Sequence, residues 1–341
     1  MKKLGLVEKI IFIANTIFAV LLLMSYLTPY IKPQSFSVIA VLSLAVPLLI
    51  LLNALFVLYW FLNAKRYFLM SVIVLLLGYN FVGALYKFSS TRNIDKTSNF
   101  SVMNYNVRLF NLYNWIDEEG VQTKITNFIE EEQPDIICFQ EYNPHDSINL
   151  PDYNYKFEEL SGKRTRYGQA IYSKFPIVES GSFEFQNSGN NAIYVDVVKE
   201  QDTLRVYNIH LQSAGINAEM EEITKENSER LFKRLTTTFK TQQTQAESFV
   251  EHRNSSPHKM IICGDFNNTA YSYVYKLIKG DALVDTFEEA GNGFGRTYDL
   301  KYFPLRIDFI LADEDFEVNH FKTYDIKLSD HYPILTKLSL P

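Results

Sequence analysis

The stretch that decides the fold is IICGDFN, residues 261–267, where an apolar run ends in glycine and then in polar residues. Apolar and β-branched residues followed by glycine and aspartate are typical of a buried strand that ends in a turn. Binding and catalytic groups often gather where a rigid strand meets its loop. The stretch therefore predicts a strand that places Asp265 and Asn267 at the edge of a sheet.

Four further clusters share this pattern: MNYNVR at 103–108, IICFQE at 136–141, VYNIHL at 206–211, and RIDFI at 306–310 with SDHYP at 329–333. Taken singly, an acid or amide after a strand is usually a turn residue. Taken together, the clusters offer carboxylates, amides and two histidines. Hard oxygen ligands suit Mg²⁺ or Mn²⁺ rather than zinc, and imidazoles suit proton transfer and charge stabilisation.

The order N-x-N-V, Q-E, N-x-H-L, G-D-F-N, R-I-D-F-I and S-D-H-Y-P resembles the endonuclease/exonuclease/phosphatase superfamily, over roughly residues 98–341. The resemblance implies an α+β fold, a four-layered α/β sandwich in which two packed mixed β-sheets are flanked by helices. It also implies hydrolysis of a phosphoester by metal-activated attack of water.

The resemblance implies a metal site and a substrate contact. Asn106, Glu141 and Asp330 are expected to hold Mg²⁺, or Mn²⁺ as the alternative. Arg108, in N-x-R, is similar to the deoxyribonuclease-like pattern and is expected to bind substrate.

The resemblance also implies catalytic roles. Asp265 is expected to orient or deprotonate the attacking water, and Asn267 to hold this water or a phosphate oxygen of the substrate. His331 is expected to contact the scissile phosphate, with Asp308 as its orienting partner. His210 matches the second histidine of the deoxyribonuclease-like and sphingomyelinase-like branches.

The first third of the chain has a different composition. Residues 10–31, 33–64 and 67–86 contain no charged side chain. Each is long enough to cross a hydrocarbon core of about 30 Å, which needs roughly 20 helical residues. These stretches predict three transmembrane α-helices ahead of the sandwich. The expected organisation is a membrane domain at 1–88, a tether at 89–97 and a catalytic domain at 98–341.

Within the globular part, strands are predicted at 100–107, 135–140, 168–173, 192–198, 203–211, 259–263, 306–311 and 334–338, and helices at 117–132 and 219–251. The strands are rich in β-branched and aromatic residues. The two helices carry apolar residues at helical spacing.

Charge predicts the orientation. Residues 1–86 hold six basic residues and one acid, a net charge of +5, so the other 255 residues carry −11 of the whole chain's −6. Lysines at 2, 3 and 9 and the pair Lys65-Arg66 flank the helices on one side, against Lys32 on the other. Basic short loops stay in the cytoplasm. We therefore expect a multi-pass inner-membrane protein with an extracytoplasmic catalytic domain.

Some polar residues admit two interpretations. Asn15, Asn53 and Asn80 lie at membrane depth and predict either a site or hydrogen bonds between helices. Cys138 and Cys263 each lie in an apolar strand and predict either buried thiols or a disulfide.

Two surface features are also open. The basic run at 163–166 either grips an anion or is a solvated loop. Tyr271, Tyr273 and Tyr275 either line a substrate groove or pack a helix.

These features predict a membrane-anchored, Mg²⁺-dependent phosphodiesterase with a small or lipid-borne substrate. An endonuclease or exonuclease acting on extracytoplasmic nucleic acid is the alternative, although a charge of −11 does not favour binding of a long polyanion. An inactive membrane scaffold is the alternative from another class. The expected partners are the lipid bilayer and the phosphodiester substrate, and no protein partner is inferable from the sequence.

Overall fold

The computed structural model describes residues 4–88, 99–145, 147–162, 165–215, 225–300 and 303–340. Their contacts divide the chain into two compact units. The first unit comprises Met1–Tyr86, Ile223–Gln243 and Asn268–Lys276, and the second comprises Lys87–Glu222, Thr244–Asn267 and Leu277–Pro341. The expected tether at 89–97 lies outside the described residues, and the expected domain boundaries remain a prediction.

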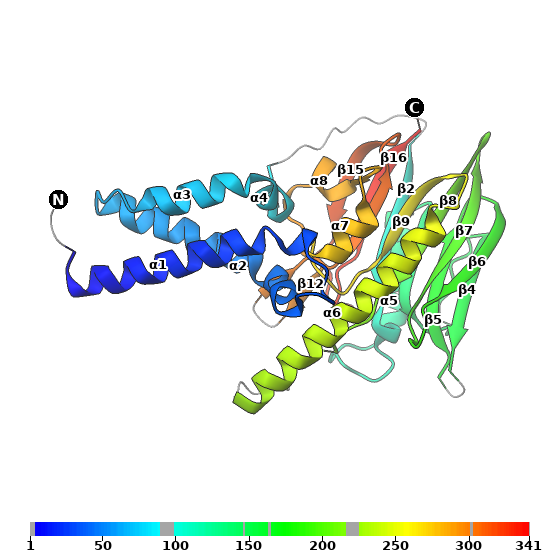
Figure 1. The fold of residues 1–341 in the computed structure, drawn as a ribbon. Helices are drawn as coiled ribbons and strands as arrows, with labels where there is room; N and C mark the ends of the chain where they lie inside the picture. Colours follow the sequence, from blue (N-terminus) through cyan, green and yellow to red (C-terminus); the bar gives the residue numbers. More distant parts are fainter. Residues whose placement is uncertain are drawn as a thin grey trace. The chain divides into compact units, whose positions relative to one another are not determined.

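The second unit contains two six-stranded sheets (Figure 1). The first sheet has the order β15-β16-β2-β3-β5-β4, with β15 Glu317–Thr323, β16 Ile334–Ser339, β2 Phe100–Asn106, β3 Ile136–Tyr142, β5 Tyr167–Ser173 and β4 Tyr155–Ser161. The second has the order β10-β14-β9-β8-β7-β6, with β10 Leu283–Asp285, β14 Asp308–Asp313, β9 Lys259–Asp265, β8 Asp202–His210, β7 Asn191–Lys199 and β6 Ile177–Glu184.

Both sheets are mixed. The pair β2–β3 is parallel in the first sheet and the pair β8–β9 is parallel in the second, while their other neighbours are antiparallel. Strands that run parallel end at the same edge of a sheet. In each sheet, two of the predicted site clusters therefore lie beside each other at the carboxyl ends of the two parallel strands.

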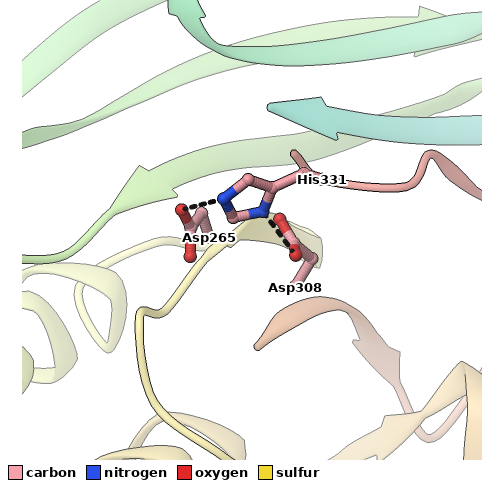
Figure 2. Close-up of side chains that lie close together, drawn as sticks. All are labelled: Asp265, Asp308 and His331. Atoms are coloured by element: carbon pink, nitrogen blue, oxygen red, sulfur yellow. Dashed lines mark hydrogen bonds and ion pairs between the residues drawn. The ribbon is translucent and has the colours of Figure 1, made fainter. Parts of the chain in front are cut away.

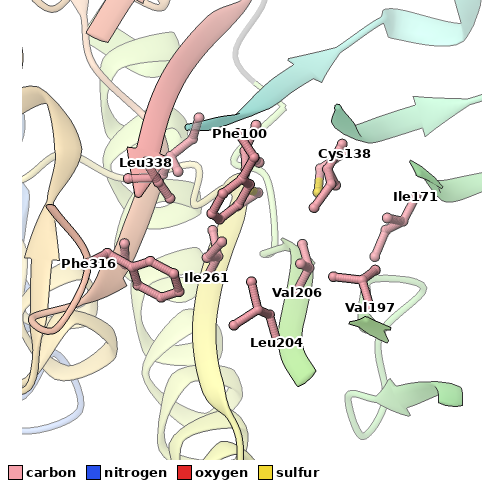
Figure 3. Close-up of a cluster of buried hydrophobic side chains, with 14 of the residues drawn as sticks. Phe100, Cys138, Ile171, Val197, Leu204, Val206, Ile261, Phe316 and Leu338 are labelled. Atoms are coloured by element: carbon pink, nitrogen blue, oxygen red, sulfur yellow. The ribbon is translucent and has the colours of Figure 1, made fainter. Parts of the chain in front are cut away.

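An apolar cluster fills the space between the two sheets (Figure 3). It includes Phe100 and Cys138 from one sheet and Val206 and Ile261 from the other. A second cluster lies between the other face of the first sheet and helix α5, Val121–Glu132, which begins four residues later than predicted. The packing confirms the α+β sandwich of two mixed sheets with flanking helices.

Short elements complete the description. They are η2 Arg108–Asn111, α7 Tyr273–Lys279, α8 Thr286–Ala290, β1 Tyr86–Lys87, β11 Gly293–Phe294, β12 Tyr298–Leu300 and β13 Phe303–Leu305. Two of them, α7 and β1, include residues of both units. Of the helix predicted at 219–251, residues 219–224 lie outside the described residues, and the rest is observed within α6, Lys225–Arg253.

The first unit contains the apolar helices: α1 Leu6–Ser25, η1 Thr28–Tyr30, α2 Ser37–Leu62, α3 Phe68–Leu77 and α4 Tyr79–Leu85. Within the described residues, two helical segments are long and apolar enough to cross a membrane, and α3 with α4 is a third if the bent pair counts as one span.

The third predicted helix, at 67–86, differs from the expectation. It is broken, and its two halves meet at an angle of 76°. The Tyr26 hydroxyl donates to the carbonyl of Val74 at 3.0 Å, and the Tyr26 ring fills the space in which a Cβ on Gly78 would lie. The break therefore lies at Gly78, where the absence of a side chain makes room for the Tyr26 ring that follows α1.

A buried polar network joins the three helices. Asn15 Nδ2 donates to Ser71 Oγ at 2.6 Å, and Ser71 Oγ donates to Asn53 Oδ1 at 2.9 Å. Trp60 Nε1 donates to Asn15 Oδ1 at 3.0 Å. The helix–helix interpretation is confirmed for Asn15 and Asn53, whereas Asn80 is exposed.

The two cysteines and two of the three tyrosines lie in the interior of the protein. Cys138 and Cys263 are buried free thiols, and burial next to Cys263 raises the pKa of Cys138 well above its usual value. Tyr271 and Tyr275 are buried, and Tyr271 packs among the apolar side chains of the first unit.

Candidate active site

Four predicted site residues come together at the carboxyl ends of the parallel strands. Asn106 ends β2, and Glu141 lies near the end of β3 beside it. His210 ends β8 and is paired in register with Asp265, which ends β9. The two sheets thus bring residues 35 to 159 positions apart in the chain into one polar cluster at one end of the sandwich.

Asn106 connects the two sheets within this cluster. Its Nδ2 donates to Asp265 Oδ2 at 3.0 Å and lies 3.5 Å from Glu141 Oε1. Its Oδ1 accepts from the backbone N–H of Arg108 at 3.1 Å. One amide therefore fixes the separation of two carboxylates from different sheets.

Asp308, His331 and Asp265 form a buried chain of interactions (Figure 2). His331 Nδ1 lies 2.9 Å from Asp308 Oδ2, and His331 Nε2 lies 3.7 Å from Asp265 Oδ2. Burial alone lowers the pKa of His331, but the charges of Asp308 and Asp265 outweigh it and raise the pKa well above its usual value. The imidazole is thus held as a cation at neutral pH.

Asp265 is almost completely buried, with 1% of its surface exposed. Burial raises the pKa of its carboxyl to about 6, with Asp308 adding to the rise and His331 opposing it. Its Oδ1 accepts from the backbone N–H of Asn267 at 2.8 Å. A carboxylate with a pKa near neutrality, next to a cationic imidazole, is suited to accept a proton from water.

His210 approaches the same carboxylate from the second sheet. Its Nε2 lies 3.7 Å from Asp265 Oδ2 and 4.0 Å from Glu141 Oε1. Among the described residues this buried nitrogen has no hydrogen-bond partner. Burial lowers the pKa of His210, so the ring is neutral and its Nε2 faces the cluster with free hydrogen-bonding capacity.

Glu141 is the more open carboxylate, with a third of its side chain exposed. Burial raises its pKa, His331 opposes that rise, and the negative charge of Asp330 adds to it. Asp330 itself pairs with Arg108, whose Nη1 lies 3.1 Å from Asp330 Oδ2.

The carboxylate oxygens of Glu141 and Asp330 therefore fit a divalent cation. They repel each other across a partly open site, and hard oxygens are what Mg²⁺ and Mn²⁺ bind.

The ligand atoms of Asp265, Asp308 and His331 also lie within 4.8 Å of one another. However, Asp308 and His331 already bond each other at 2.9 Å, which uses one ligand atom of each. This triad is better suited to holding and moving a proton than to binding a metal.

The backbone is strained at three of the site residues. Arg108, Glu141 and Asn267 have φ values of 42°, 49° and 48°, in the left-handed region. For residues other than glycine this conformation costs roughly 1–2 kcal/mol each. Such strain is characteristic of functional sites, where the surrounding contacts enforce it.

Arg108 begins a left-handed turn, Arg108–Asn111, in which all four residues have positive φ. The turn is held by Phe110, which is 1% exposed and packs against Tyr142. It brings the Arg108 guanidinium over the ring of Trp115, with 4.6 Å between the guanidinium carbon and the ring centroid.

The structure places all of the sequence-predicted site residues in or next to this cluster. Asn267 Nδ2 donates to the carbonyl of Leu211, which follows His210. Of the basic run at 163–166, Lys163 and Arg164 lie outside the described residues.

Several residues at the site were not predicted. The Tyr298 ring lies 4.9 Å from the ring of His331, and the Trp115 ring packs against the Arg108 guanidinium. Asn104, Gln140 and Asn208 form a buried layer beneath the cluster. The spacing of two residues between Asn104 and Asn106, and between Asn208 and His210, is the one signal that could have indicated this layer.

Comparisons with known proteins are consistent with this geometry. The family model described as Endonuclease/Exonuclease/phosphatase family matches residues 103–331. A second model, described only as a domain of unknown function, matches residues 8–85. None of the curated proteins compared with the chain matches it.

Solved structures share the fold of the larger part of the chain. The endonuclease/exonuclease/phosphatase from Bacteroides vulgatus has 17% identity and a TM-score of 0.56, over 72% of this chain and 100% of that one. A humanized D. rerio TDP2 has 17% identity and a TM-score of 0.54, over 71% and 100% of the two chains. The human Nocturnin catalytic domain with a bound sulfate anion has 16% identity and a TM-score of 0.52, over 72% and 95%.

Proposed function

The chain belongs to the endonuclease/exonuclease/phosphatase family, and from this premise we propose that it is a membrane-anchored, Mg²⁺-dependent phosphodiesterase. Family membership gives the reaction class, hydrolysis of a phosphoric ester bond. We propose further that the protein is a multi-pass inner-membrane protein with its catalytic domain outside the cytoplasm, and that its substrate is a small or lipid-borne phosphodiester.

The proposal rests on the interacting triad Asp308, His331 and Asp265. In this triad a cationic imidazole lies next to a carboxylate whose pKa is raised. Phosphodiester hydrolysis needs a group that takes a proton from water and a cation that offsets charge on the phosphate. Asp265 and His331 supply these two functions 3.7 Å apart.

Each residue then has a role in the reaction. Asp265 accepts the proton of the attacking water, and Asn267 holds this water or a phosphate oxygen. His331 donates from Nε2 toward the scissile phosphate, while Asp308 accepts from Nδ1 and fixes the orientation of the ring. His210 contributes a second hydrogen bond to the phosphate from its unpartnered Nε2.

Glu141 and Asp330 would hold the metal, because they supply hard carboxylate oxygens beside His331 and Asp265. Asn106 would join them through Oδ1 after a rotation of its amide, since its Nδ2 faces Glu141 and Asp265 and its Oδ1 accepts from Arg108 in this structure. Mg²⁺, or Mn²⁺ in its place, would supply a Lewis acid that withdraws charge from the phosphoryl oxygens. Arg108 pairs with Asp330 and would contact the same phosphate.

The charge of the chain favours a small or lipid-borne substrate. The residues after the apolar helices carry −11, and binding of a long polyanion requires many cationic contacts. The apolar helices would hold the site near a bilayer.

A nuclease is the second candidate, and the aromatic loop favours it. Tyr113 and Trp115 are 58% and 40% exposed next to Arg108, and aromatic rings of this kind stack on bases.

The test is a substrate panel on the full chain in detergent, with Mg²⁺ fixed and salt varied. The panel comprises plasmid, a single-stranded oligonucleotide, bis(p-nitrophenyl) phosphate, and zwitterionic and anionic phospholipid vesicles. We expect release from the small diester or from vesicles with a shallow salt dependence, and no turnover by a His331→Ala control. Fast cleavage of plasmid with a steep salt slope, and none of the other substrates, would establish the nuclease instead.

A further inference from the structure

A layer of three amide side chains lies directly beneath the candidate active site. Asn104 on β2, Gln140 on β3 and Asn208 on β8 are each 0% exposed. They precede Asn106, Glu141 and His210 by two, one and two residues. An unpaired buried amide costs roughly 1–3 kcal/mol, so a complete layer of them between two sheets calls for an explanation.

Strand β3 contains a bulge at the residue expected to hold the metal. Phe139 pairs with Ala170 on β5, and the next pair is Tyr142 with Gly168, so two residues of β3 oppose one residue of β5. Glu141 lies inside this bulge with a φ of 49°.

The bulge determines where Glu141 points. Phe139 and Tyr142 belong to the same apolar cluster, although residues three apart in a regular strand face opposite ways. In a strand without the extra residue, Glu141 would lie two residues after Phe139 on the same face and would point into the apolar cluster. The bulge shifts the register by one residue and so turns the Glu141 side chain to the other face.

Asn208 binds this bulge from the opposite sheet. Its Nδ2 donates to the carbonyl of Phe139 at 2.8 Å and lies 3.3 Å from that of Ala170. These two residues form the last regular pair before the bulge. One side chain of β8 therefore fixes both strands at the point where the ladder changes register.

The orientations of the other amides follow from these two carbonyls. A carbonyl only accepts, so Asn208 must direct its Nδ2 at them and its Oδ1 at Gln140. Gln140 then presents Nε2, which donates to Asn208 Oδ1 at 2.5 Å and to Asn104 Oδ1 at 2.7 Å. The donors and acceptors are therefore set from the bulge outward, and among the described residues Asn104 Nδ2 and Gln140 Oε1 are left without a partner.

We propose that Asn208 is a positioning residue that locks the β3 bulge and thereby holds the Glu141 carboxylate in the metal site. The inference rests on the proposed function for the metal role of Glu141. Outer partners of a metal site typically change metal affinity by 10–100-fold when they are removed.

The experiment measures Mn²⁺ binding by electron paramagnetic resonance on the full chain in detergent. Asn208→Ala should weaken Mn²⁺ binding by about tenfold or more. Asn319→Ala is the matched control: Asn319 is 1% exposed, is hydrogen-bonded to Ser339 on a neighbouring strand, and lies on β15. The control should lose a comparable amount of thermal stability and change Mn²⁺ affinity less than twofold.

Hydrogen–deuterium exchange without metal gives a second readout. The backbone amides of residues 139–142 should exchange faster in Asn208→Ala than in wild type or Asn319→Ala. If Asn208→Ala does not fold, Gln140→Met retains the side-chain volume, removes the amide, and should change both readouts in the same direction.

Mn²⁺ affinity and exchange equal to those of the control would overturn the positioning role. Wild-type protein that binds no Mn²⁺ would reject the metal role of Glu141 in the proposed function. The exchange comparison would still decide whether Asn208 locks the bulge.

Discussion

At the scale of single residues, Glu141 has the largest expected effect on metal-dependent turnover. Glu141→Gln keeps the shape of the side chain and removes its charge, so we expect at least about a 10²-fold loss in rate, the size of one electrostatic catalytic element. Rate against Mg²⁺ concentration is the measurement, with the exposed Glu314→Gln as control. Activity that persists in Glu141→Gln and in excess chelator would contradict the assignment.

The pair Asp308 and His331 should control the alkaline side of the pH profile. Asp308 raises the pKa of His331, so the imidazole stays cationic to higher pH and activity falls only when it loses its proton. Asp308→Asn removes that charge and should move the alkaline limb of kcat/KM to lower pH. The acid limb should follow Asp265, whose carboxylate forms as the pH rises through about 6.

A double mutant separates this role from a structural one. Residues that act as a unit share their cost, so Asp308→Asn with His331→Ala should be little worse than His331→Ala alone. Additive losses, or an alkaline limb that does not move in Asp308→Asn, would mean that Asp308 does not act through His331 and only stabilises the strand that contains it.

At the scale of elements, β8 and β9 approach each other too closely for any side chain at Gly264. A Cβ there would lie 2.0 Å from the carbonyl oxygen of Ile209, a backbone atom that cannot rotate away. Gly264→Ala should therefore destabilise the protein by at least about 2 kcal/mol, which lowers Tm by about 4–8 °C.

The control for this prediction is Gly181→Ala on β6. A Cβ at Gly181 would meet the far end of the Tyr194 side chain, which can move. We expect a loss below about 1 kcal/mol, measured by thermal circular dichroism in the same detergent. Equal losses of stability in the two variants would contradict the prediction that the close approach of β8 and β9 requires glycine at position 264.

The elements also show how much of the fold the sequence predicts. All eight predicted strands are present, because each contains a run of buried apolar residues, many of them β-branched or aromatic. The four edge strands of the two six-stranded sheets were missed: β4, β6 and β15 have one solvent-exposed face and correspondingly polar sequences, and β10 has only three residues.

The site shows the same limit. Asp265 and His210 end apolar strands and were predicted, since the change from apolar to polar is local. Asn208 belongs to the N-x-H-L motif, but nothing local in the sequence shows that its amide reaches a bulge on another sheet. The approach of Arg108 to Trp115 depends on a left-handed turn at Leu109 and Phe110, residues that have no preference for it.

At the scale of the whole molecule, the distribution of charge predicts the topology. Basic residues flank the apolar helices on the side of the N-terminus, so the N-terminus should lie in the cytoplasm and the hydrolase outside it. Protease added to intact spheroplasts should digest the part of the chain after residue 98. An N-terminal tag should stay protected until lysis. Protection of both parts before lysis would contradict the model.

The first unit has one further consequence, which concerns modularity. Thr28 Oγ1 donates to the carbonyl of Tyr271 at 2.6 Å, and Thr269 Oγ1 donates to that of Ser43 at 3.1 Å. The segment Asn268–Lys276 thus belongs with the apolar helices, although it begins one peptide bond after Asn267. A hydrolase truncated at residue 98 would retain the Tyr271 carbonyl and the Thr269 hydroxyl without their hydrogen-bond partners on the helical segments. We therefore expect that another membrane anchor could not replace these helices without a loss of stability.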